Sequence, residues 1–233
     1  MVEITNYNTF LNFSEKNNCF VLTPPKTGSR NITRILKFLD FNTYGWDDNK
    51  FIFINLGPSH NHTLKLMEDH LNHQVIITCR NPYAILASMF RLSMLPKKTI
   101  RSTFNIKDEF IEFLKEYLFY NESDPWLIPS LKNSIDQLKK RKIDHRIKLE
   151  SFSENIMQIP FIKNYSQETI DQIEMLSKEK HGDYRDIQNH SNIENYFPSD
   201  FKLYYKQESA EIVYTTFKDK FIIMDYHKDS WMS

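Results

Sequence analysis

The chain lacks the long apolar runs and the cysteine pattern that define several large protein classes. No run of about 18 apolar residues occurs in its 233 residues, so we expect no transmembrane helix and no membrane insertion. Residues 1–13 carry polar residues along their whole length and lack an apolar core segment, so we expect no signal peptide and a cytoplasmic location. Two cysteines, Cys19 and Cys79, are too few for a disulfide framework or a zinc site, and their apolar surroundings are typical of buried, reduced thiols.

An excess of charge of one sign is also missing. Lys and Arg together number 30, as do Asp and Glu, so we expect no nucleic-acid partner. No carboxylate cluster has the character of a Mg²⁺ site. Aromatic residues, by contrast, are abundant. The chain has 18 Phe, 12 Tyr and 3 Trp, which argues against a disordered chain. The length then predicts a single domain over residues 1–233.

Short apolar runs alternate with helical patterns over the first 95 residues. The apolar runs predict strands at 19–23, 51–54 and 75–79. This alternation favours an α/β fold of three layers, α/β/α, with a central and mostly parallel sheet. The second half is predicted to be helix-rich, with one further strand. Its helices are expected around 110–118, 131–138, 170–176 and 209–217, and its strand at 146–149.

The segment after the first predicted strand has the chemistry of an anion site. A loop that leaves a strand and enters a helix directs backbone N–H groups and the helix dipole at whatever lies above the strand end. In this loop Lys26 adds a full charge, and Gly28 permits close backbone approach. Thr27 and Ser29 add hydroxyl donors. The alternative is an ordinary turn with an incidental lysine, and the loop lacks the G-x-x-x-x-G-K-[ST] order of nucleoside-triphosphate loops.

A second candidate segment follows the strand at 75–79. Arg80 comes just past this strand, and Ser88 lies about two turns into the helix that Pro82 is expected to open. Parallel strands end at one edge of the sheet, where ligands bind, so Arg80 and Lys26 are expected at the same edge. The guanidinium fork holds a phosphate through two donors, so a nucleotide with two separated phosphates could reach from Lys26 to Arg80. A surface ion pair is the alternative for Arg80.

Together the two segments resemble a known family. Pro25-Lys26-Thr27-Gly28-Ser29 resembles the 5′-phosphosulfate loop of sulfotransferases that use 3′-phosphoadenosine 5′-phosphosulfate (PAPS). Arg80-Asn81-Pro82, with Ser88 eight residues after the Arg, resembles their 3′-phosphate motif. Weaker likenesses are Ile147–Phe152, to a strand that ends in Glu before a helix, and Phe217–Tyr226, to the aromatic end of the domain. The resemblance covers about residues 18–226.

The resemblance implies a P-loop NTPase-like sulfotransferase architecture with PAPS as donor, adenosine 3′,5′-bisphosphate (PAP) as product and no required metal. It assigns the donor to the residues of both motifs: Pro25, Lys26, Thr27, Gly28, Ser29, Arg30, Arg80 and Ser88. The stretch 180–185 resembles a loop over the 3′-phosphate in the carbohydrate-type branch, which would add Gly182 and Arg185; a plain surface loop is the alternative.

Departures from the family favour one branch. Arg30-Asn31 stand where the cytosolic branch often has a Trp, and its Arg-Lys-Gly tail is absent. The pattern is closer to the carbohydrate-type branch, whose members are usually anchored in the Golgi. Because we expect no anchor here, the resemblance implies a cytoplasmic relative of bacterial or viral origin.

The expected reaction is in-line sulfuryl transfer to a hydroxyl of an acceptor such as a carbohydrate or small metabolite. Lys26 would stabilise the charge that develops on the leaving phosphate. A His suits the base that takes the hydroxyl proton. In a parallel sheet, the loop after the second strand would open beside Lys26, and in the family a His or Glu from this part of the chain is the base. We prefer His62 over His60, with Glu68 as the Glu candidate; exposed loop histidines are the alternative.

Two other functions remain open. A nucleotide kinase of P-loop type would need Mg²⁺ and ATP, and the missing G-x-x-x-x-G-K-[ST] motif argues against it. A non-catalytic nucleotide-binding module of the same fold would bind PAP without turnover. The residues do not identify the acceptor or the oligomeric state.

Overall fold

The computed structural model describes residues 10–24, 27–39, 41–47, 50–52, 69–94, 105–120, 142–179, 197 and 199–232. The chain divides into two compact units, each made from two stretches of sequence. The first unit comprises Met1–Arg80 with Pro125–Glu179, and the second Asn81–Asp124 with Lys180–Ser233. The expectation of a single domain over 1–233 stays a prediction.

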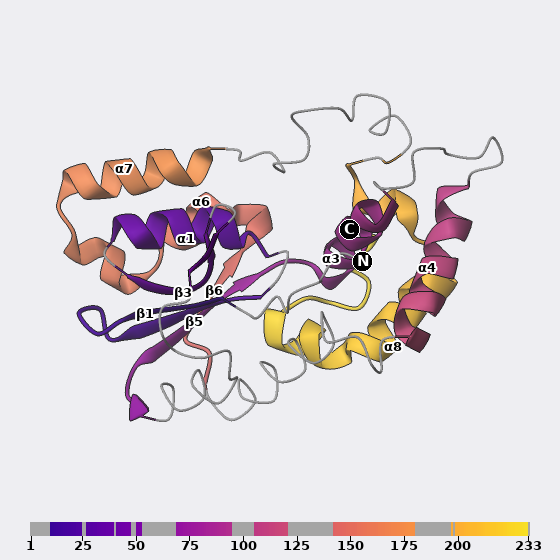
Figure 1. Cartoon of the computed structure of the whole chain (residues 1–233), viewed down its shortest axis with the longest axis horizontal. Helices are drawn as coiled ribbons and strands as arrows, with labels where there is room; N and C mark the ends of the chain where they lie inside the picture. The colour runs from indigo at the N-terminus through magenta and orange to yellow at the C-terminus, as the bar shows by residue number, and fades with distance from the viewer. Residues whose placement is uncertain are drawn as a thin grey trace. The chain divides into compact units, whose positions relative to one another are not determined.

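The first unit contains the sheet (Figure 1). In the described part of the chain it has six strands, in the order β4-β3-β1-β2-β5-β6. They are β1 (Phe10–Ser14), β2 (Cys19–Thr23), β3 (Asn42–Asp47), β4 (Lys50–Ile52), β5 (Gln74–Cys79) and β6 (His145–Lys148). β5 runs parallel to β2 and to β6, whereas β1 is antiparallel to β2 and β3, and β4 is antiparallel to β3. Strands β2, β3, β5 and β6 therefore share one direction, and the predicted α/β class with a mostly parallel sheet is confirmed.

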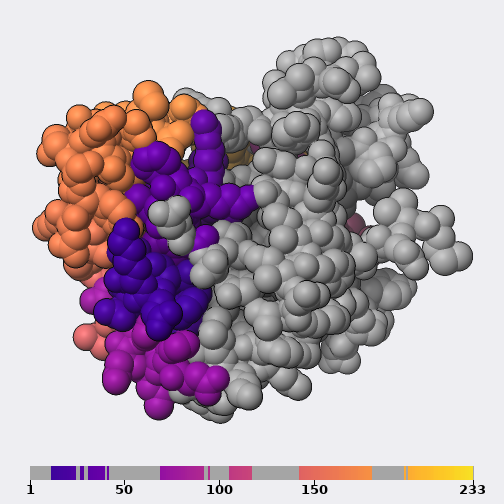
Figure 2. Space-filling view, turned by 60° about the vertical axis from the view of Figure 1, so that its left-hand side comes forward, coloured from indigo at the N-terminus to yellow at the C-terminus, as the bar shows by residue number. Residues whose placement is uncertain are grey.

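Three described helices cover one face of this sheet (Figure 1). They are α1 (Ser29–Phe38), α6 (Phe152–Met157) and α7 (Gln167–Lys178), with the 3₁₀ turns η1 (Leu149–Ser151) and η2 (Pro160–Asn164) between β6 and α7. α7 packs on α1, where Arg34 pairs with Glu179, and Figure 2 shows the orange surface of α7 adjoining α1. This arrangement gives the sheet a continuous helical layer on that face.

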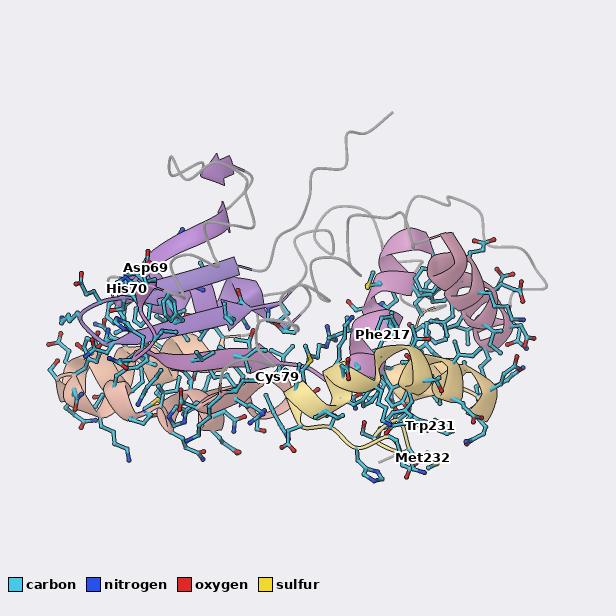
Figure 3. All side chains as sticks on the ribbon, turned by 90° about the horizontal axis from the view of Figure 1, so that it is seen from below. Asp69, His70, Cys79, Phe217, Trp231 and Met232 are labelled. Atoms are coloured by element: carbon cyan, nitrogen blue, oxygen red, sulfur yellow. The ribbon has the colours of Figure 1, made fainter. Side chains whose placement is uncertain are left out.

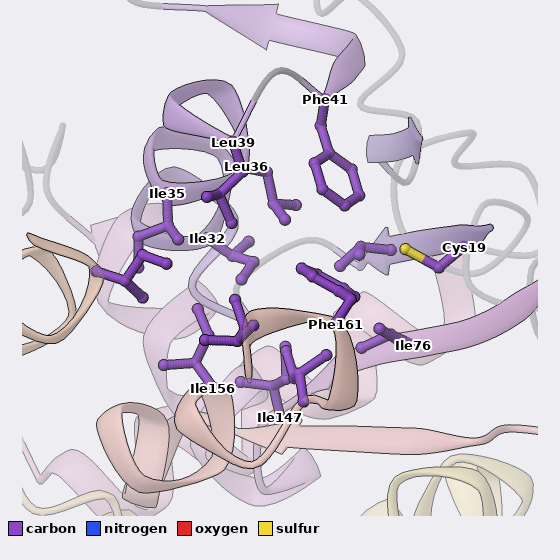
Figure 4. Close-up of a cluster of buried hydrophobic side chains, with 14 of the residues drawn as sticks. Cys19, Ile32, Ile35, Leu36, Leu39, Phe41, Ile76, Ile147, Ile156 and Phe161 are labelled. Atoms are coloured by element: carbon purple, nitrogen blue, oxygen red, sulfur yellow. The ribbon is translucent and has the colours of Figure 1, made fainter. Parts of the chain in front are cut away.

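The core of the first unit lies between the sheet and these helices (Figure 4). Cys19, Val21 and Ile76 contribute the strand side, and Phe161 of η2 packs against Phe41 with ring centroids 5.5 Å apart. The intervening strand residues, which alternate to the other face, are buried as well: Phe20, Leu22, Val75 and Ile77. Burial on both faces explains the continuous apolar runs of β2 and β5. The three-layer arrangement itself stays a prediction.

The second unit is helical. Its elements are α3 (Pro82–Met94), α4 (Ile106–Tyr120), the 3₁₀ turn η3 (Phe201–Tyr204) and α8 (Gln207–Met224). Aromatic rings form much of its core, for example Tyr83 edge-on to both Tyr205 and Phe221 with centroids 4.9 Å apart. Burial raises the pKa of Tyr83 to about 12, so its hydroxyl stays protonated and donates to the Lys228 carbonyl at 2.6 Å.

Helix α8 carries a local irregularity and a buried cation. Phe217 has non-helical angles inside the helix (φ −114°, ψ 24°), and Figure 3 labels it on α8. The ammonium group of Lys220 lies 4.1 Å from the centroid of the Phe217 ring. Burial lowers the pKa of Lys220 to about 7, because a charged ammonium is poorly solvated there.

Most of the predicted elements that fall on described residues are confirmed. These are β2, β5, β6 and the helices α1, α3, α4, α7 and α8, the last of which extends beyond the predicted 209–217 to Met224. Both cysteines are free and buried as expected, and burial raises the pKa of Cys19 to about 12. Among the described helices none has the length and apolar character needed to cross a bilayer. The helix predicted at 131–138 lies outside the described residues.

One predicted strand is wrong in its direction. The run at 51–54 was expected to be a parallel strand, but its described part belongs to β4, which pairs antiparallel with β3. The physical reason is that β3 and β4 are close in sequence, with only residues 48 and 49 between them. A connection of this length joins antiparallel strands, whereas a parallel pair needs a crossover of a dozen or more residues.

Candidate anion site at the carboxyl edge of the sheet

Three parallel strands of the first unit end at the same edge of the sheet. In the register of these strands Leu22 is opposite Ile77, and Cys79 is opposite Lys148. The segments that leave this edge are the loop 24–28 into α1, Arg80 after β5, and Leu149 after β6. The structure therefore confirms the strand directions that the sequence argument needed for the loop and for Arg80. Figure 3 labels Cys79 at the point where β5 ends.

The loop is closed by hydrogen bonds to its own first carbonyl. The N–H of Thr27 lies 3.3 Å from the carbonyl oxygen of Pro24, and the Thr27 hydroxyl lies 2.6 Å from the same oxygen. Thr27 Oγ1 is also 2.7 Å from Oγ1 of Thr78 on β5, and both threonines are fully buried. The hydroxyl of Thr27, predicted to serve a ligand, is instead bonded inside the protein and fixes the loop.

Gly28 joins the loop to α1 in a conformation that other residues avoid. It is the N-cap residue of α1, with φ +82° and ψ 27° in the left-handed region. A Cβ built on Gly28 would lie 2.6 Å from Cδ1 of Leu149, at the start of η1. The glycine is therefore needed for its backbone conformation and for its close contact with Leu149.

The start of α1 has the character of an anion-binding site. The N–H of Ile32 donates to the carbonyl of Gly28 and is the first intrahelical donor, so the N–H groups of Ser29, Arg30 and Asn31 have no carbonyl within the helix to bond. The N-cap residue Gly28 has no side chain to cap these N–H groups, and the first turn contains no acidic residue. Unpaired N–H groups and the helix dipole favour an anion at such a helix start.

The Arg-Asn-Pro motif has a clear local structure. Arg80 is half-buried and follows β5 directly. Asn81 caps α3: its Oδ1 accepts the N–H of Tyr83 at 3.1 Å, and its carbonyl accepts the N–H of Ile85 at 3.0 Å. Its Nδ2 also donates to the carbonyl of Ser230 at 3.1 Å. Pro82 opens the helix as predicted, and Ser88 is a half-buried residue of α3 in the second unit.

The segment Ile147–Phe152, which resembles a family strand that ends in Glu before a helix, also has the expected local structure. β6 runs into η1 and then α6, so a strand is followed by a helix as predicted for 147–152. The N–H of Lys148 donates to Oδ1 of Asn155 at 2.8 Å, which ties the end of the strand to α6. Glu150 is exposed in η1.

Several predicted site residues lie outside the described residues. They are Pro25, Lys26, His60, His62, Glu68, Gly182 and Arg185, together with the side chains of Ser29 and Arg30. Their roles stay predictions. One argument for His60 and His62 is wrong, however, because it assumed that the strand before them runs parallel to β2. β4 runs in the opposite direction, so its carboxyl end points to the edge opposite the loop 24–28.

The structure adds residues that the sequence reasoning missed. Thr78, Leu149 and Asn155 all contact the three strand ends or the loop that follows them. A signal for Thr78 was present: it is the polar residue in the otherwise apolar run 75–79. The described ranges contain no group of three or more His, Cys, Asp or Glu placed to hold a metal ion.

Comparison of the chain with protein-family models, with curated proteins and with solved structures gives no match.

Proposed function

We propose that this protein is a sulfotransferase that moves a sulfuryl group from PAPS to an acceptor hydroxyl, of a carbohydrate or a small metabolite. The observation that supports the proposal is that two candidate anion-binding elements follow neighbouring parallel strands at one edge of the sheet. The uncapped start of α1 follows β2, and Arg80 follows β5. The proposal includes the P-loop NTPase-like sulfotransferase architecture, PAP as product, a cytoplasmic location and a bacterial or viral origin.

The chemistry of the loop favours one phosphate group over a polyphosphate chain. Pro24 and Pro25 have no N–H, and the N–H of Thr27 is used by the Pro24 carbonyl. At most the N–H groups of Lys26, Gly28 and the first turn of α1 remain for a ligand. Nucleoside-triphosphate loops instead surround their phosphates with successive backbone N–H groups. This difference supports the 5′-phosphosulfate of PAPS over ATP.

The position of Thr27 argues in the same direction. In the G-x-x-x-x-G-K-[ST] loop, the hydroxyl after the lysine ligates Mg²⁺. Thr27 follows Lys26, but its hydroxyl is buried and bonded to Pro24 and Thr78. Its proton and one acceptor site are thus committed within the protein, which disfavours the kinase alternative.

The proposed reaction gives specific roles to the base candidates, Lys26, Arg80 and Ser88. The bond between sulfur and the 5′-phosphate oxygen breaks, and that oxygen keeps the electron pair as PAP leaves. The acceptor oxygen forms the new bond to sulfur, and its proton passes to the base, for which His62 and then His60 are the candidates. Lys26 stabilises the developing negative charge, and Arg80 with Ser88 holds the 3′-phosphate.

The test is calorimetric titration of the purified protein with PAP in EDTA, beside ATP with Mg²⁺. We expect micromolar PAP affinity and no ATP binding. Lys26→Ala and Arg80→Ala should each weaken PAP binding by about 10- to 100-fold, since a hydrogen bond to a charged group contributes about 1.5–3 kcal/mol. Arg80→Lys should fall between, because it keeps the charge and loses the fork. Lys163→Ala, an exposed lysine of η2 in the same unit, is the matched control.

Each outcome separates the hypotheses. ATP binding without PAP binding would replace the sulfotransferase proposal with the kinase. Binding of neither nucleotide would contradict the donor site. PAP binding without sulfate transfer to any acceptor hydroxyl, and without any effect of His62→Ala, would favour the non-catalytic module.

A further inference from the structure

Thr78 places a hydroxyl group inside a strand whose neighbouring residues are apolar. It lies near the end of β5, is fully buried, and is followed by Cys79 and Arg80. A buried hydroxyl without a partner costs free energy, so its hydrogen bonds identify what the residue does.

The distances fix the direction of these hydrogen bonds. The Thr27 hydroxyl lies 2.6 Å from the Pro24 carbonyl oxygen, which can only accept, so Thr27 is the donor there. A hydroxyl has one proton, so Thr78 is the donor in its 2.7 Å contact with Thr27. The Leu22 carbonyl, 3.5 Å from the Thr78 hydroxyl, is at the outer limit of hydrogen bonding. Two hydroxyls thus connect β5 to the loop after β2.

This connection completes the attachment of the loop to all three parallel strand ends. Pro24 follows β2, Thr27 is bonded through Thr78 to β5, and Gly28 lies against Leu149 after β6. The N–H groups at the start of α1 follow Gly28 directly, so their position depends on how firmly the loop is held. A preorganised site binds more tightly because less conformational freedom is lost on binding.

We infer that Thr78 is a positioning residue of the anion site: its hydroxyl, acting through Thr27, holds Thr27 and Gly28 in place at the start of α1, where the donor phosphate binds. This inference rests on the proposed function. It assigns a role to Thr78, a residue that belongs to neither sequence motif and acts on the ligand only through Thr27. The alternative is that Thr78 only contributes to the stability of the core.

Two substitutions separate these roles. Thr78→Val keeps the shape and removes the hydroxyl, whereas Thr78→Ser keeps the hydroxyl and removes a buried methyl group. If Thr78 only stabilised the core, the lost methyl of Thr78→Ser would matter at least as much as the lost hydroxyl. Thr33→Val, at a buried threonine on α1, is the matched control. Thr27→Val breaks the same connection from the loop side and serves if Thr78→Val does not fold.

The first readout needs no ligand: amide hydrogen exchange of residues 24–32 in the free, full-length protein. We expect Thr78→Val to speed exchange at the amides of Thr27 and Ile32 by about tenfold, as for the loss of one hydrogen bond, while Thr78→Ser and Thr33→Val match the wild type. The second readout is PAP affinity by calorimetry. Thr78→Val should bind PAP about tenfold more weakly, and Thr78→Ser should bind it as the wild type does.

The outcomes distinguish failure of the inference from failure of the proposed function. Equal exchange in Thr78→Val and Thr78→Ser would overturn the inference, and so would faster exchange with unchanged PAP affinity. If the wild type binds no PAP, the proposed function fails, and the exchange contrast still shows whether Thr78 holds the loop.

Discussion

Replacing Gly28 with alanine tests the local structure of the anion site most directly. The substitution has two separate costs. A residue with a Cβ in the left-handed region is strained by about 1–2 kcal/mol. The new Cβ would also lie 2.6 Å from Cδ1 of Leu149, whereas carbon atoms in contact prefer about 3.5–4.0 Å.

The total follows from these two costs. Overpacking costs about 1–3 kcal/mol, and the lower end applies here because the clashing atom is the end of the half-buried Leu149 side chain, which can turn aside by roughly 1 Å. Alanine returns about 0.4–1 kcal/mol by restricting the unfolded chain. Gly28→Ala should therefore lower the free energy of unfolding by about 1–3 kcal/mol. For a chain of this size that corresponds to a fall in Tm of roughly 2–12 °C.

Urea unfolding followed by circular dichroism measures this loss, and a double-mutant cycle with Leu149→Ala separates its parts. Truncating Leu149 should recover the steric part and leave the backbone strain, giving a coupling of about 1 kcal/mol. Asn18→Ala is the control for strain alone, because Asn18 also has positive φ (50°) and is exposed. A Gly28→Ala protein within about 0.5 kcal/mol of the wild type, or a coupling near zero, would refute the reasoning.

Two further predictions concern the second unit. Lys220 has a pKa of about 7 in the folded protein against 10.5 ordinarily, so between these pH values unfolding takes up a proton and stability rises with pH. The gain from pH 7 to pH 9 should be about 2 kcal/mol, and Lys220→Met should remove this slope in urea titrations at the two pH values. Asn81→Ala should cost about 1–2 kcal/mol in the same assay, since it removes the α3 cap and the bond to Ser230. Asn81→Asp keeps the acceptor for the Tyr83 amide and should lose less; equal losses would contradict the capping role.

The parts of the fold that the sequence predicted are those with a strong local signal. β2 and β5 are continuous apolar runs because their side chains are buried on both faces, and their short length between turn residues favours a strand over a buried helix. Asn81 and Pro82 likewise mark the start of α3. Asn81 accepts hydrogen bonds from the N–H groups of Tyr83 and Ile85, so the signal lies within four residues of the sequence.

The antiparallel strands β1 and β3 were missed for the opposite reason. β1 (FLNFS) is neither a continuous apolar run nor a regular alternation, and its polar Asn12 is fully buried with its Nδ2 donating to the Val21 carbonyl at 3.2 Å. β3 (Asn42–Asp47) contains no apolar run. Such strands are stabilised by their pairing partners, and composition does not specify those partners. The direction of β4 followed from the unseen β3, so it was predicted wrongly.

The same distinction applies to the candidate site. The loop after β2 and Arg80 follow strands whose direction is confirmed, so strand order alone brings them to one edge. Strand order gives no such support to the base candidates His60 and His62, which lie between β4 and β5 in the sequence. β4 ends and β5 begins at the opposite edge of the sheet. From Ile52 to His62 an extended chain spans at most about 35 Å, which exceeds the roughly 20 Å length of a six-residue strand. The chain is therefore long enough for His62 to reach the edge that carries the loop 24–28, but the direction of β4 does not predict that His62 lies there. The assignment of the base depends on the sulfotransferase resemblance and on turnover measurements, whereas the contacts of Thr27, Gly28 and Thr78 show how the end of the loop after β2 is held.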